Sequence, residues 1–526
     1  MKDNFAQIAT VQDEPETGIK LNIKKGGVKM ISKTNKDEFL DYLSDAANIK
    51  GDGTALYIPE NKAELATLVR ELYRSNTPFT LSAKRTSLTG AAIPRGGVIV
   101  STEKLNGIIE INKDKKTITV EAGVLINEIQ ESLYANGFFY APDPTEENST
   151  IGGNIATNAS GAKSFKYGST RNHVLELEII LPDGEPAKLI RGKNFAKEYA
   201  LELCLNSGEV RNINLPVYEM PQVKNTAGYF VKKGMDAIDL FIGTEGTLGI
   251  ITEAKLKIIP IPHHIFSAVL FFPNEEQGLN FVSLAAEQSL NSKAINDQFG
   301  INARALEFFD RNALLFAAED YPNIPPASGC AVWLEQELSV ETEDPVLSKW
   351  YSIFMEFNLD IDKIWVATNY PEEKKIASFR HSLPSKVNEY IARNNFSKVG
   401  TDVAVERKHF KKFYFEIKDL TIKSNLNFVI YGHFGDSHIH LNMLPRNENE
   451  LLVAKSNYDI ICKTALKYGG TVSAEHGIGK LKTHLLLEMY GEGNIKKMAA
   501  LKKSMDPLLL LNSGNIIPPE IFESLA

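Results

Sequence analysis

The chain has 526 residues, 43% of them hydrophobic and 24% charged, and a chain of this length forms roughly two to four globular domains. Its net charge of −8 at pH 7 argues against a general nucleic-acid-binding protein. No apolar run is long enough to cross a membrane, and the first residues lack the apolar core of a signal peptide. The three cysteines lie far apart and suit free thiols, which fits a cytoplasmic protein.

The first part of the chain predicts a polar arm followed by alternating strands and helices. Residues 1–50 form the expected N-terminal arm, with one helix from Lys36 to Ala47. A helix is expected at Lys62–Arg74, because its leucines recur at helical spacing. A second helix is expected at Val124–Asn136. Runs rich in β-branched residues predict strands at Ala55–Ile58, Phe79–Ser82, Val98–Ser101, Ile108–Ile111, Thr117–Ala122 and Glu176–Leu181.

Composition changes further along the chain indicate the domain boundaries. Residues 190–235 mix polar and apolar residues without a clear period, and we expect an insertion with helices there. Residues 239–259 return to strands, and Pro260-Ile-Pro262 marks a boundary. We therefore expect a first domain at 51–262, an α+β domain at 263–450 and a mostly helical segment at 451–526.

The first domain contains three loops rich in glycine and hydroxyl residues: Ser82–Ala91, Thr150–Gly161 and Gly243–Gly249. Small residues let the backbone approach a phosphate, and successive N–H groups can bind an anion. One such loop is more often only a tight turn, but three in one domain favour a nucleotide. The chain has no Gly-x-Gly-x-x-Gly opening a helix and no Walker A sequence, which excludes a Rossmann-type NAD site and a P-loop.

The most specific feature is a group of four histidines, His433, His438, His440 and His476, with Glu475 beside the last. Imidazole nitrogens and carboxylate oxygens are common ligands of divalent transition metals. A strand places alternate residues on one face, so His438 and His440 share a face, and a break in the strand after His433 can bring that ring back to them. A single histidine is usually a hydrogen-bonded core residue, but this group predicts a metal site with one histidine left to move a proton.

These motifs resemble a known flavoprotein superfamily. Thr86–Gly90, Ile151–Asn154, Lys166–Gly168, Lys224–Tyr229 and Gly243–Gly249 resemble the FAD-binding domain of the vanillyl-alcohol-oxidase superfamily. The histidine group and Leu511–Gly514 resemble its D-lactate, D-2-hydroxyglutarate and glycolate dehydrogenase branch. The resemblance implies an α+β fold: an FAD-binding domain of the PCMH type with two subdomains, an α+β cap domain that binds substrate, and a C-terminal helical segment that returns to the FAD domain.

The resemblance implies non-covalent FAD, since the loops at 82–91 and 150–168 contain no histidine or cysteine to bond it. Relatives carry glycines where this chain has Ala83, Lys84 and Arg85, whose charges either bind phosphate or face solvent. The residues assigned to FAD are Thr86, Ser87, Leu88, Thr89, Gly90, Pro142, Thr150, Gly152, Gly153, Asn154, Asn158, Gly161, Tyr167, Gly168, Glu245, Gly249, Ile250, Ile251 and Asn512.

The resemblance also selects the metal ligands. It assigns His433, His440 and Glu475 to a divalent metal, with zinc as the expected ion. His438 stands where relatives carry Asn and is either an extra ligand or a neighbour. Asp436 is expected to accept a hydrogen bond from a ligand histidine.

The implied reaction is oxidation of a D-2-hydroxy acid to the 2-oxo acid, with hydride transfer to flavin N5. His476 would take the hydroxyl proton, Arg380 would bind the substrate carboxylate, and Asn442 would lie near substrate and flavin. Gly400 and Pro384 stand where relatives specific for a dicarboxylate carry Lys and Thr, which favours D-lactate or a related acid over 2-hydroxyglutarate. The electrons would pass to a quinone, a cytochrome or an electron-transfer flavoprotein, and the sequence leaves peripheral contact with the inner face of the membrane open.

Two other functions stay open at this stage. One is a non-redox flavoenzyme of the alkylglycerone-phosphate synthase type, from the same superfamily. The other is a flavin-free binding or scaffold subunit, which the loss of glycines at Ala83, Lys84 and Arg85 would suit.

Overall fold

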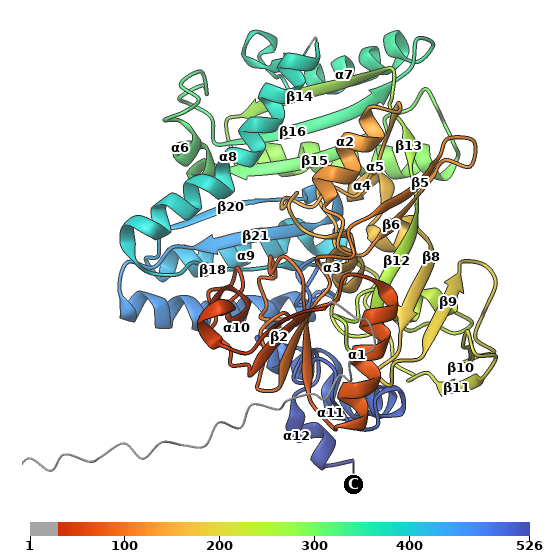
Figure 1. The fold of residues 1–526 in the computed structure, drawn as a ribbon. Helices are drawn as coiled ribbons and strands as arrows, with labels where there is room; N and C mark the ends of the chain where they lie inside the picture. Colours follow the sequence, from red (N-terminus) through yellow and green to blue (C-terminus); the bar gives the residue numbers. More distant parts are fainter. Residues whose placement is uncertain (1–29, 368, 526) are drawn as a thin grey trace, which may run out of the picture.

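The computed structural model describes residues 30–367 and 369–525, so residues 1–29 of the expected arm lie outside the described residues. The fold mixes helices and sheets, as the sequence predicted (Figure 1). In Figure 1 a large sheet occupies the upper half of the molecule, and two smaller sheets from the first part of the chain lie below it.

A mostly parallel sheet of four strands begins the described chain. Its order is β1 (Ile31–Lys33), β2 (Ala55–Ile58), β4 (Val98–Ser101) and β3 (Phe79–Ser82), with β1 antiparallel to β2. Helix α1 (Lys62–Arg74) packs on it, and Asn61 caps the helix by accepting a hydrogen bond from the Glu64 N–H. The helical period of the sequence accounts for the buried face, which consists of Leu65, Leu68, Val69 and Leu72.

An antiparallel sheet of five strands follows. Its order is β5 (Ile108–Asn112), β6 (Thr117–Glu121), β12 (Ile250–Lys257), β8 (Val174–Ile180) and β9 (Pro186–Ile190). A two-stranded pair, β7 (Phe138–Phe139) with β13 (Ile259–Pro260), lies apart from it. The helical elements of this region are α2 (Ile126–Tyr134), α3 (Ile151–Thr157), α4 (Ser164–Tyr167), η3 (Thr170–His173) and η4 (Ala237–Phe241).

Three local predictions were wrong. The helix expected at Lys36–Ala47 is two short turns, η1 (Lys36–Glu38) and η2 (Leu40–Leu43), because the chain bends at Phe39 to bury that ring. Residues 190–235, all described, contain no helix. Part of this segment forms a hairpin, β10 (Ala200–Cys204) and β11 (Val210–Asn214), in which the leucines of β10 stand at every second position and are buried while the residues between them are exposed.

The glycine-rich segment expected as a loop contains helix α3 (Ile151–Thr157). Thr150 caps it by accepting a hydrogen bond from the Gly153 N–H, and Asn158 ends it with a φ of 51°. Gly152 packs so closely on β6 that an added Cβ would lie 2.7 Å from the Ala122 Cβ. Tertiary packing therefore sustains a helix that glycine alone disfavours.

The large sheet has eight strands. They run in the order β17 (Trp365–Ala367), β14 (His264–Phe272), β16 (Cys330–Leu338), β15 (Ala303–Asp310), β20 (Phe428–Gly432), β21 (His438–Met443) and β18 (Val399–Gly400), with β19 (Val403–Ala404) also paired to β21. Helices α5 (Glu275–Ala294), α7 (Glu343–Glu356) and α9 (Arg407–Lys423) share one core, and α6 (Arg311–Ala317) and α8 (Tyr370–Asn394) share another. A short turn, η5 (Ile361–Lys363), precedes β17.

The C-terminal segment is mostly helical and returns to the first sheet. It contains α10 (Glu448–Lys467), α11 (Thr483–Met505) and α12 (Pro519–Glu523). Between α11 and α12 the chain pairs with β3. The Phe79 N–H donates to the Leu510 carbonyl at 2.8 Å, and the Asn512 N–H donates to the Phe79 carbonyl at 2.9 Å. Figure 1 shows α11 and α12 below β2 and α1. Within the described residues, no helix is long and apolar enough to cross a membrane.

Candidate active site

The histidine group forms at the edge of the large sheet, where β20 turns into β21. His433 directly follows the end of β20, the short turn η6 (Phe434–Asp436) comes next, and Ser437 has a φ of 56° before β21 begins at His438. The rings of His438 and His440 lie 4.4 Å apart between centroids, and the His433 ring lies 5.3 Å and 5.5 Å from them. The turn therefore returns His433 to the face of the strand, as the sequence predicted.

Glu475 joins this group from the loop between α10 and α11. Its Oε2 lies 3.4 Å from His433 Nε2 and 3.7 Å from His440 Nε2. Its Oε1 accepts hydrogen bonds from the Ser160 hydroxyl at 2.9 Å and from the Lys224 ammonium. Burial opposes ionisation, but the charges on His433 and Lys224 hold the pKa of Glu475 well below its usual range. Oε2 of an ionised carboxylate thus faces the rings.

Each of the three rings is held from behind by an oxygen that can only accept a hydrogen bond. The pairs are His433 Nδ1 with Glu307 Oε1 at 2.7 Å, His438 Nε2 with Asp402 Oδ1 at 3.1 Å, and His440 Nδ1 with the Thr401 carbonyl at 3.2 Å. Each ring must donate there, so the nitrogen on its other side carries a lone pair when the ring is neutral. Histidines held in this way are able to bind a metal.

Sequence reasoning missed Glu307 and Asp402 and assigned a similar task to Asp436. That expectation was wrong: the carboxylate of Asp436 lies 3.7 Å from the Lys224 ammonium, and Glu307 and Asp402 are the carboxylates that hold histidines. The available signal for Glu307 was an acid among the apolar residues of β15, a strand that proves to be buried at every position. A buried acid requires a partner, although the sequence does not say which.

Asp402 also fixes the loop that carries the acid and the fourth histidine. Its carboxylate accepts from the backbone N–H groups of Glu475 at 3.0 Å and His476 at 2.9 Å. It also accepts from the Ser473 hydroxyl at 2.7 Å and the Lys482 ammonium at 3.0 Å. One buried carboxylate therefore orients both the loop and the His438 ring.

His476 lies beside the group with its ring stacked on His440, at 5.4 Å between centroids and 13° between planes. Its Nδ1 lies 3.5 Å from Asp402 Oδ2, and 30% of its side chain is exposed. Burial lowers the pKa of His476 to about 4. The ring is therefore neutral near pH 7 and can accept a proton.

Arg380 and Asn442 bring two unused donors close to the histidines. Arg380, on α8, donates from Nε to Glu307 Oε2 at 2.8 Å, so one carboxylate joins it to His433. Arg380 Nη1 and Asn442 Nδ2 are buried and have no hydrogen-bond partner among the described residues. Buried donors without partners are costly, and an anionic ligand would satisfy them.

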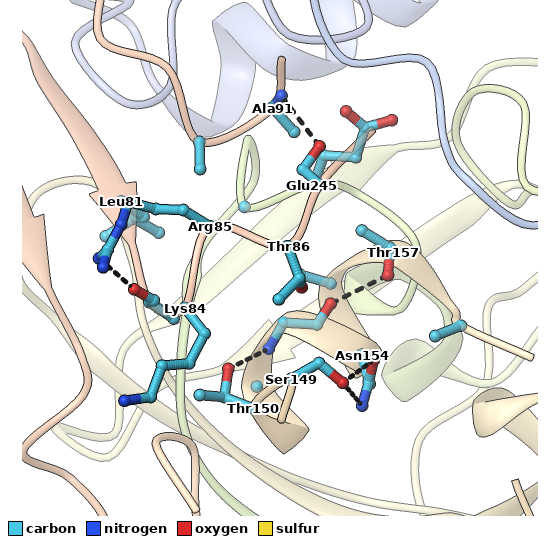
Figure 2. A pocket seen from close by; sticks show the side chains of 18 of the residues that line it. Leu81, Lys84, Arg85, Thr86, Ala91, Ser149, Thr150, Asn154, Thr157 and Glu245 are labelled. Carbon is cyan, nitrogen blue, oxygen red and sulfur yellow. Dashed lines mark hydrogen bonds between the residues drawn. The ribbon is translucent and has the colours of Figure 1, made fainter. Parts of the chain in front are cut away.

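A single cavity joins the glycine-rich segments to the histidine group. It runs between the Leu81–Ala92 loop and α3, and its lining includes His440, Glu475 and His476. Figure 2 shows Lys84, Arg85 and Thr86 on one side of it and Thr150, Asn154 and Thr157 on the other. The predicted FAD residues that line it are Thr86, Ser87, Leu88, Thr150, Gly152, Gly153, Asn154, Glu245, Gly249, Ile250, Ile251 and Asn512.

Seven predicted FAD residues do not line this cavity: Thr89, Gly90, Pro142, Asn158, Gly161, Tyr167 and Gly168. Gly161 packs against the chain, where a Cβ would lie 2.0 Å from the Asp143 carbonyl oxygen. The Thr89 carbonyl accepts from the Lys480 N–H at 2.9 Å, and the Tyr167 hydroxyl bonds to Glu337. These contacts place Gly161, Thr89 and Tyr167 in the packing around the cavity rather than on its lining.

Two of the lining residues use their side chains to fasten the C-terminal segment. The Glu245 carboxylate accepts from the N–H groups of Ile478 at 2.6 Å and Gly479 at 2.7 Å. Asn512 accepts from the Leu81 N–H at 2.7 Å and donates to the Glu245 carbonyl at 2.8 Å. These bonds hold the loop of Glu475 and His476 against the first domain.

The charged residues that replace glycines have distinct surroundings. Arg85 has a φ of 56°, a backbone conformation that favours glycine. Its guanidinium carbon lies 4.0 Å from the centre of the Tyr42 ring, and Nη1 donates to the Ala83 carbonyl at 2.6 Å. Lys84 is exposed on the cavity wall. Tyr42 therefore holds the charge of Arg85, while Lys84 has no such aromatic partner among the described residues.

Comparison with known proteins agrees with this geometry. Residues 54–189 match the FAD binding domain family, and residues 261–516 match the family of FAD linked oxidases, C-terminal domain. The chain belongs to the FAD-linked oxidases. This membership confirms the family resemblance and the fold class predicted from the sequence, including the PCMH-type FAD-binding domain. The exact domain boundaries stay predictions.

Relatives of known name cover most of the chain. The glycolate oxidase subunit GlcD of Bacillus subtilis (strain 168) is 29% identical over 474 residues, which is 88% of each chain. A D-lactate dehydrogenase of Anaerostipes hadrus is 28% identical and covers 90% of this chain and 92% of its own. A D-2-hydroxyglutarate dehydrogenase of Stutzerimonas stutzeri (strain A1501) is 27% identical, with 88% and 90% covered.

A solved structure of an alkyldihydroxyacetonephosphate synthase shares the fold. It superposes with a TM-score of 0.64 at 16% identity and covers 91% of this chain and 81% of that one. At this identity the likeness concerns the fold alone. The family matches place the chain among the FAD-linked oxidoreductases.

Proposed function

We propose that the protein is an FAD- and metal-dependent dehydrogenase that oxidises a D-2-hydroxy acid, D-lactate or a related one, to the 2-oxo acid. The observation that carries this proposal is the single cavity lined by both the FAD-domain segments and His440, Glu475 and His476. A flavin in that cavity would lie against a group able to bind metal. The names of the relatives, which include D-lactate and D-2-hydroxyglutarate dehydrogenases, support the same class of substrate.

The cavity suits FAD in its chemistry. Its walls carry small residues and hydroxyl groups, among them Thr86, Ser87, Thr150, Gly152 and Gly153. Hydroxyls donate hydrogen bonds to phosphate oxygens, and glycines leave room for the backbone to approach them. When bound, FAD supplies a ring that accepts a hydride, which no side chain can do.

The three ligands proposed for the metal are His433, His440 and Glu475, and zinc fits their nitrogen and oxygen atoms. Support comes from the rings themselves: the outer nitrogens of both histidines are engaged, and their Nε2 atoms face Glu475 Oε2. When bound, the metal supplies positive charge that lowers the pKa of a substrate hydroxyl.

Three further side chains would act on the substrate. His476 is neutral near pH 7 and would accept the hydroxyl proton. Arg380 Nη1 and Asn442 Nδ2, the two donors without protein partners, would hold the substrate carboxylate. Glu307 keeps Arg380 in place while it holds His433.

Two positions bear on which acid would be bound. A Cβ at Gly400 would lie 2.8 Å from Asn442 Oδ1, so the lysine that dicarboxylate-specific relatives carry there would require Asn442 to move. Pro384 lies inside α8 and offers no hydroxyl. Both positions favour a monocarboxylate such as D-lactate over 2-hydroxyglutarate. The proposed electron acceptor is a quinone, a cytochrome or an electron-transfer flavoprotein.

The alternatives differ in what the purified protein would do. A synthase of the alkylglycerone-phosphate type would bind FAD without net oxidation of an alcohol, and a scaffold subunit would be colourless. The test is anaerobic addition of D-lactate to the purified protein, followed by a panel of D- and L-2-hydroxy acids with a dye as electron acceptor. We expect the flavin absorbance to bleach with D-acids and turnover to stop after metal removal. Bleaching by L-acids alone, or turnover that ignores a chelator, would contradict the proposal.

A further inference from the structure

His438 has a buried ring nitrogen that no described residue uses. The residue is 0% exposed, and its Nδ1 has no hydrogen-bond partner among the described residues. A buried polar atom without a partner is destabilising, so such an atom needs an explanation.

The other side of the ring decides the chemistry of that nitrogen. His438 Nε2 lies 3.1 Å from Asp402 Oδ1, and the same carboxylate accepts hydrogen bonds from the Lys482 ammonium and from the N–H groups of Glu475 and His476. A carboxylate surrounded by donors in this way acts as the acceptor, so Nε2 carries the proton in this bond. Nδ1 of the neutral ring is then a lone pair, the form that binds a metal.

The lone pair points into the same space as the proposed ligands. His438 Nδ1 lies 4.0 Å from Glu475 Oε1, while His433 Nε2 and His440 Nε2 lie 3.4 Å and 3.7 Å from Oε2. One ligand atom from each of these four residues lies within 4.8 Å of the others. Metal–ligand bonds of about 2.0–2.1 Å in a tetrahedron place ligand atoms about 3.3 Å apart, so small shifts would let all four meet one ion.

We propose that His438 is a fourth protein ligand, so that this chain holds its metal with His433, His438, His440 and Glu475. The inference rests on the proposed function for the presence of a metal, and it goes beyond it in the number of ligands. Asp402 then orients two ligands at once, through the His438 ring and the Glu475 N–H. Four protein ligands resist chelators better than three, and substrate would enter as an additional ligand, since zinc can expand to five.

The test compares His438→Asn with two matched variants. Asn keeps an N–H that can donate to Asp402 but has no imidazole nitrogen. His433→Asn removes a ligand of the proposed function, and His484→Asn changes a histidine whose side chain is 60% exposed. All four proteins are loaded with zinc and compared by competition with a chelator, and X-ray absorption at the zinc edge counts the imidazoles. Circular dichroism and flavin content check the fold.

We expect His438→Asn to bind zinc roughly 10- to 100-fold more weakly and to lose one of three imidazoles, with His484→Asn unchanged. A change in imidazole number separates a ligand from a residue that only supports its neighbours. If His438→Asn keeps its affinity and imidazole number while His433→Asn loses both, the fourth ligand is overturned and the proposed function stands. If the unaltered protein takes up no zinc, both fail, whereas bleaching of the flavin by D-lactate tests the redox part separately.

Discussion

Glu307 and Asp310 are two buried carboxylates three residues apart on β15, and their surroundings differ sharply. Glu307 lies between the His433 ring and the Arg380 guanidinium, which hold its pKa at about 2 although burial opposes ionisation. Asp310 accepts from the N–H groups of Ala313 and Ile430, and its nearest charge is the Lys418 ammonium at 4.0 Å. Burial raises the pKa of Asp310 to about 7.

The comparison separates a carboxylate placed for chemistry from one placed for structure. Both are equally hidden from water, so burial alone does not distinguish them. Their hydrogen-bond partners distinguish them. Glu307 bonds to His433, a member of the histidine group, and to Arg380, whereas Asp310 mainly caps α6 and ties it to β20. Charge paired with charge indicates the site, and charge paired with backbone indicates the scaffold.

The largest expected effect is the loss of turnover when His476, the proposed proton acceptor, is replaced. His476→Ala should lower turnover with D-lactate by roughly 10²-fold or more, because the hydroxyl proton loses its acceptor. Flavin and zinc content should stay unchanged, since His476 is not among the proposed ligands. Steady-state kinetics with a dye acceptor measure the loss, and His484→Ala on the exposed surface is the control. Near-normal turnover would remove His476 from the mechanism.

The next effect tests Glu307 directly. Glu307→Gln should weaken zinc binding by about 10- to 100-fold, because the carboxylate that orients His433 becomes a neutral amide. The Michaelis constant for D-lactate should also rise, since Arg380 loses its ionic partner. Asp310→Asn is the matched control on the same strand and should leave both quantities unchanged. Equal losses in the two variants would mean that β15 responds to any change of charge, and the distinction would fail.

The effect of Asp310 should appear in the pH dependence of the free energy of unfolding. Its folded pKa, about 7, lies above the ordinary value of 3.8, so between these pH values the folded state binds more protons than the unfolded state. Stability is therefore lost as pH rises from about 4 to 7. Asp310→Asn removes that loss, and its free energy of unfolding should exceed that of the unaltered protein by up to a few kcal/mol above pH 7. Denaturant titrations at pH 5 and pH 8 measure the difference, and a pH-independent gap would contradict the prediction.

The features that could be predicted from the sequence are the ones that depend on residues close together in the chain. The periods of Lys62–Arg74 and the alternation at His438–His440 gave the helix, the strand and the shared face, because those patterns lie within a few residues. Glu307 and His433 are 126 positions apart and meet only when β15 pairs with β20, so no local pattern joins them. Helix α3 was missed for a related reason, since packing on Ala122 overrides the low helix propensity of its glycines.

The smallest effect is expected for Arg85, a charge on the cavity wall that already has partners within the protein. In Arg85→Gly the backbone keeps its φ of 56°, which glycine adopts without strain, while the contact with the Tyr42 ring is lost. The relief of backbone strain and the loss of the cation–π contact are each worth about 1 kcal/mol, so the melting temperature should change little. FAD affinity should change by less than about tenfold, or 1.4 kcal/mol, because the guanidinium is engaged by Tyr42 and the Ala83 carbonyl. Flavin titration of the apoprotein measures this, with Lys84→Ala as the matched variant. A larger loss in Arg85→Gly would place its charge on the cofactor phosphates, and Arg85 would then belong with Glu307 among the charges that serve the site.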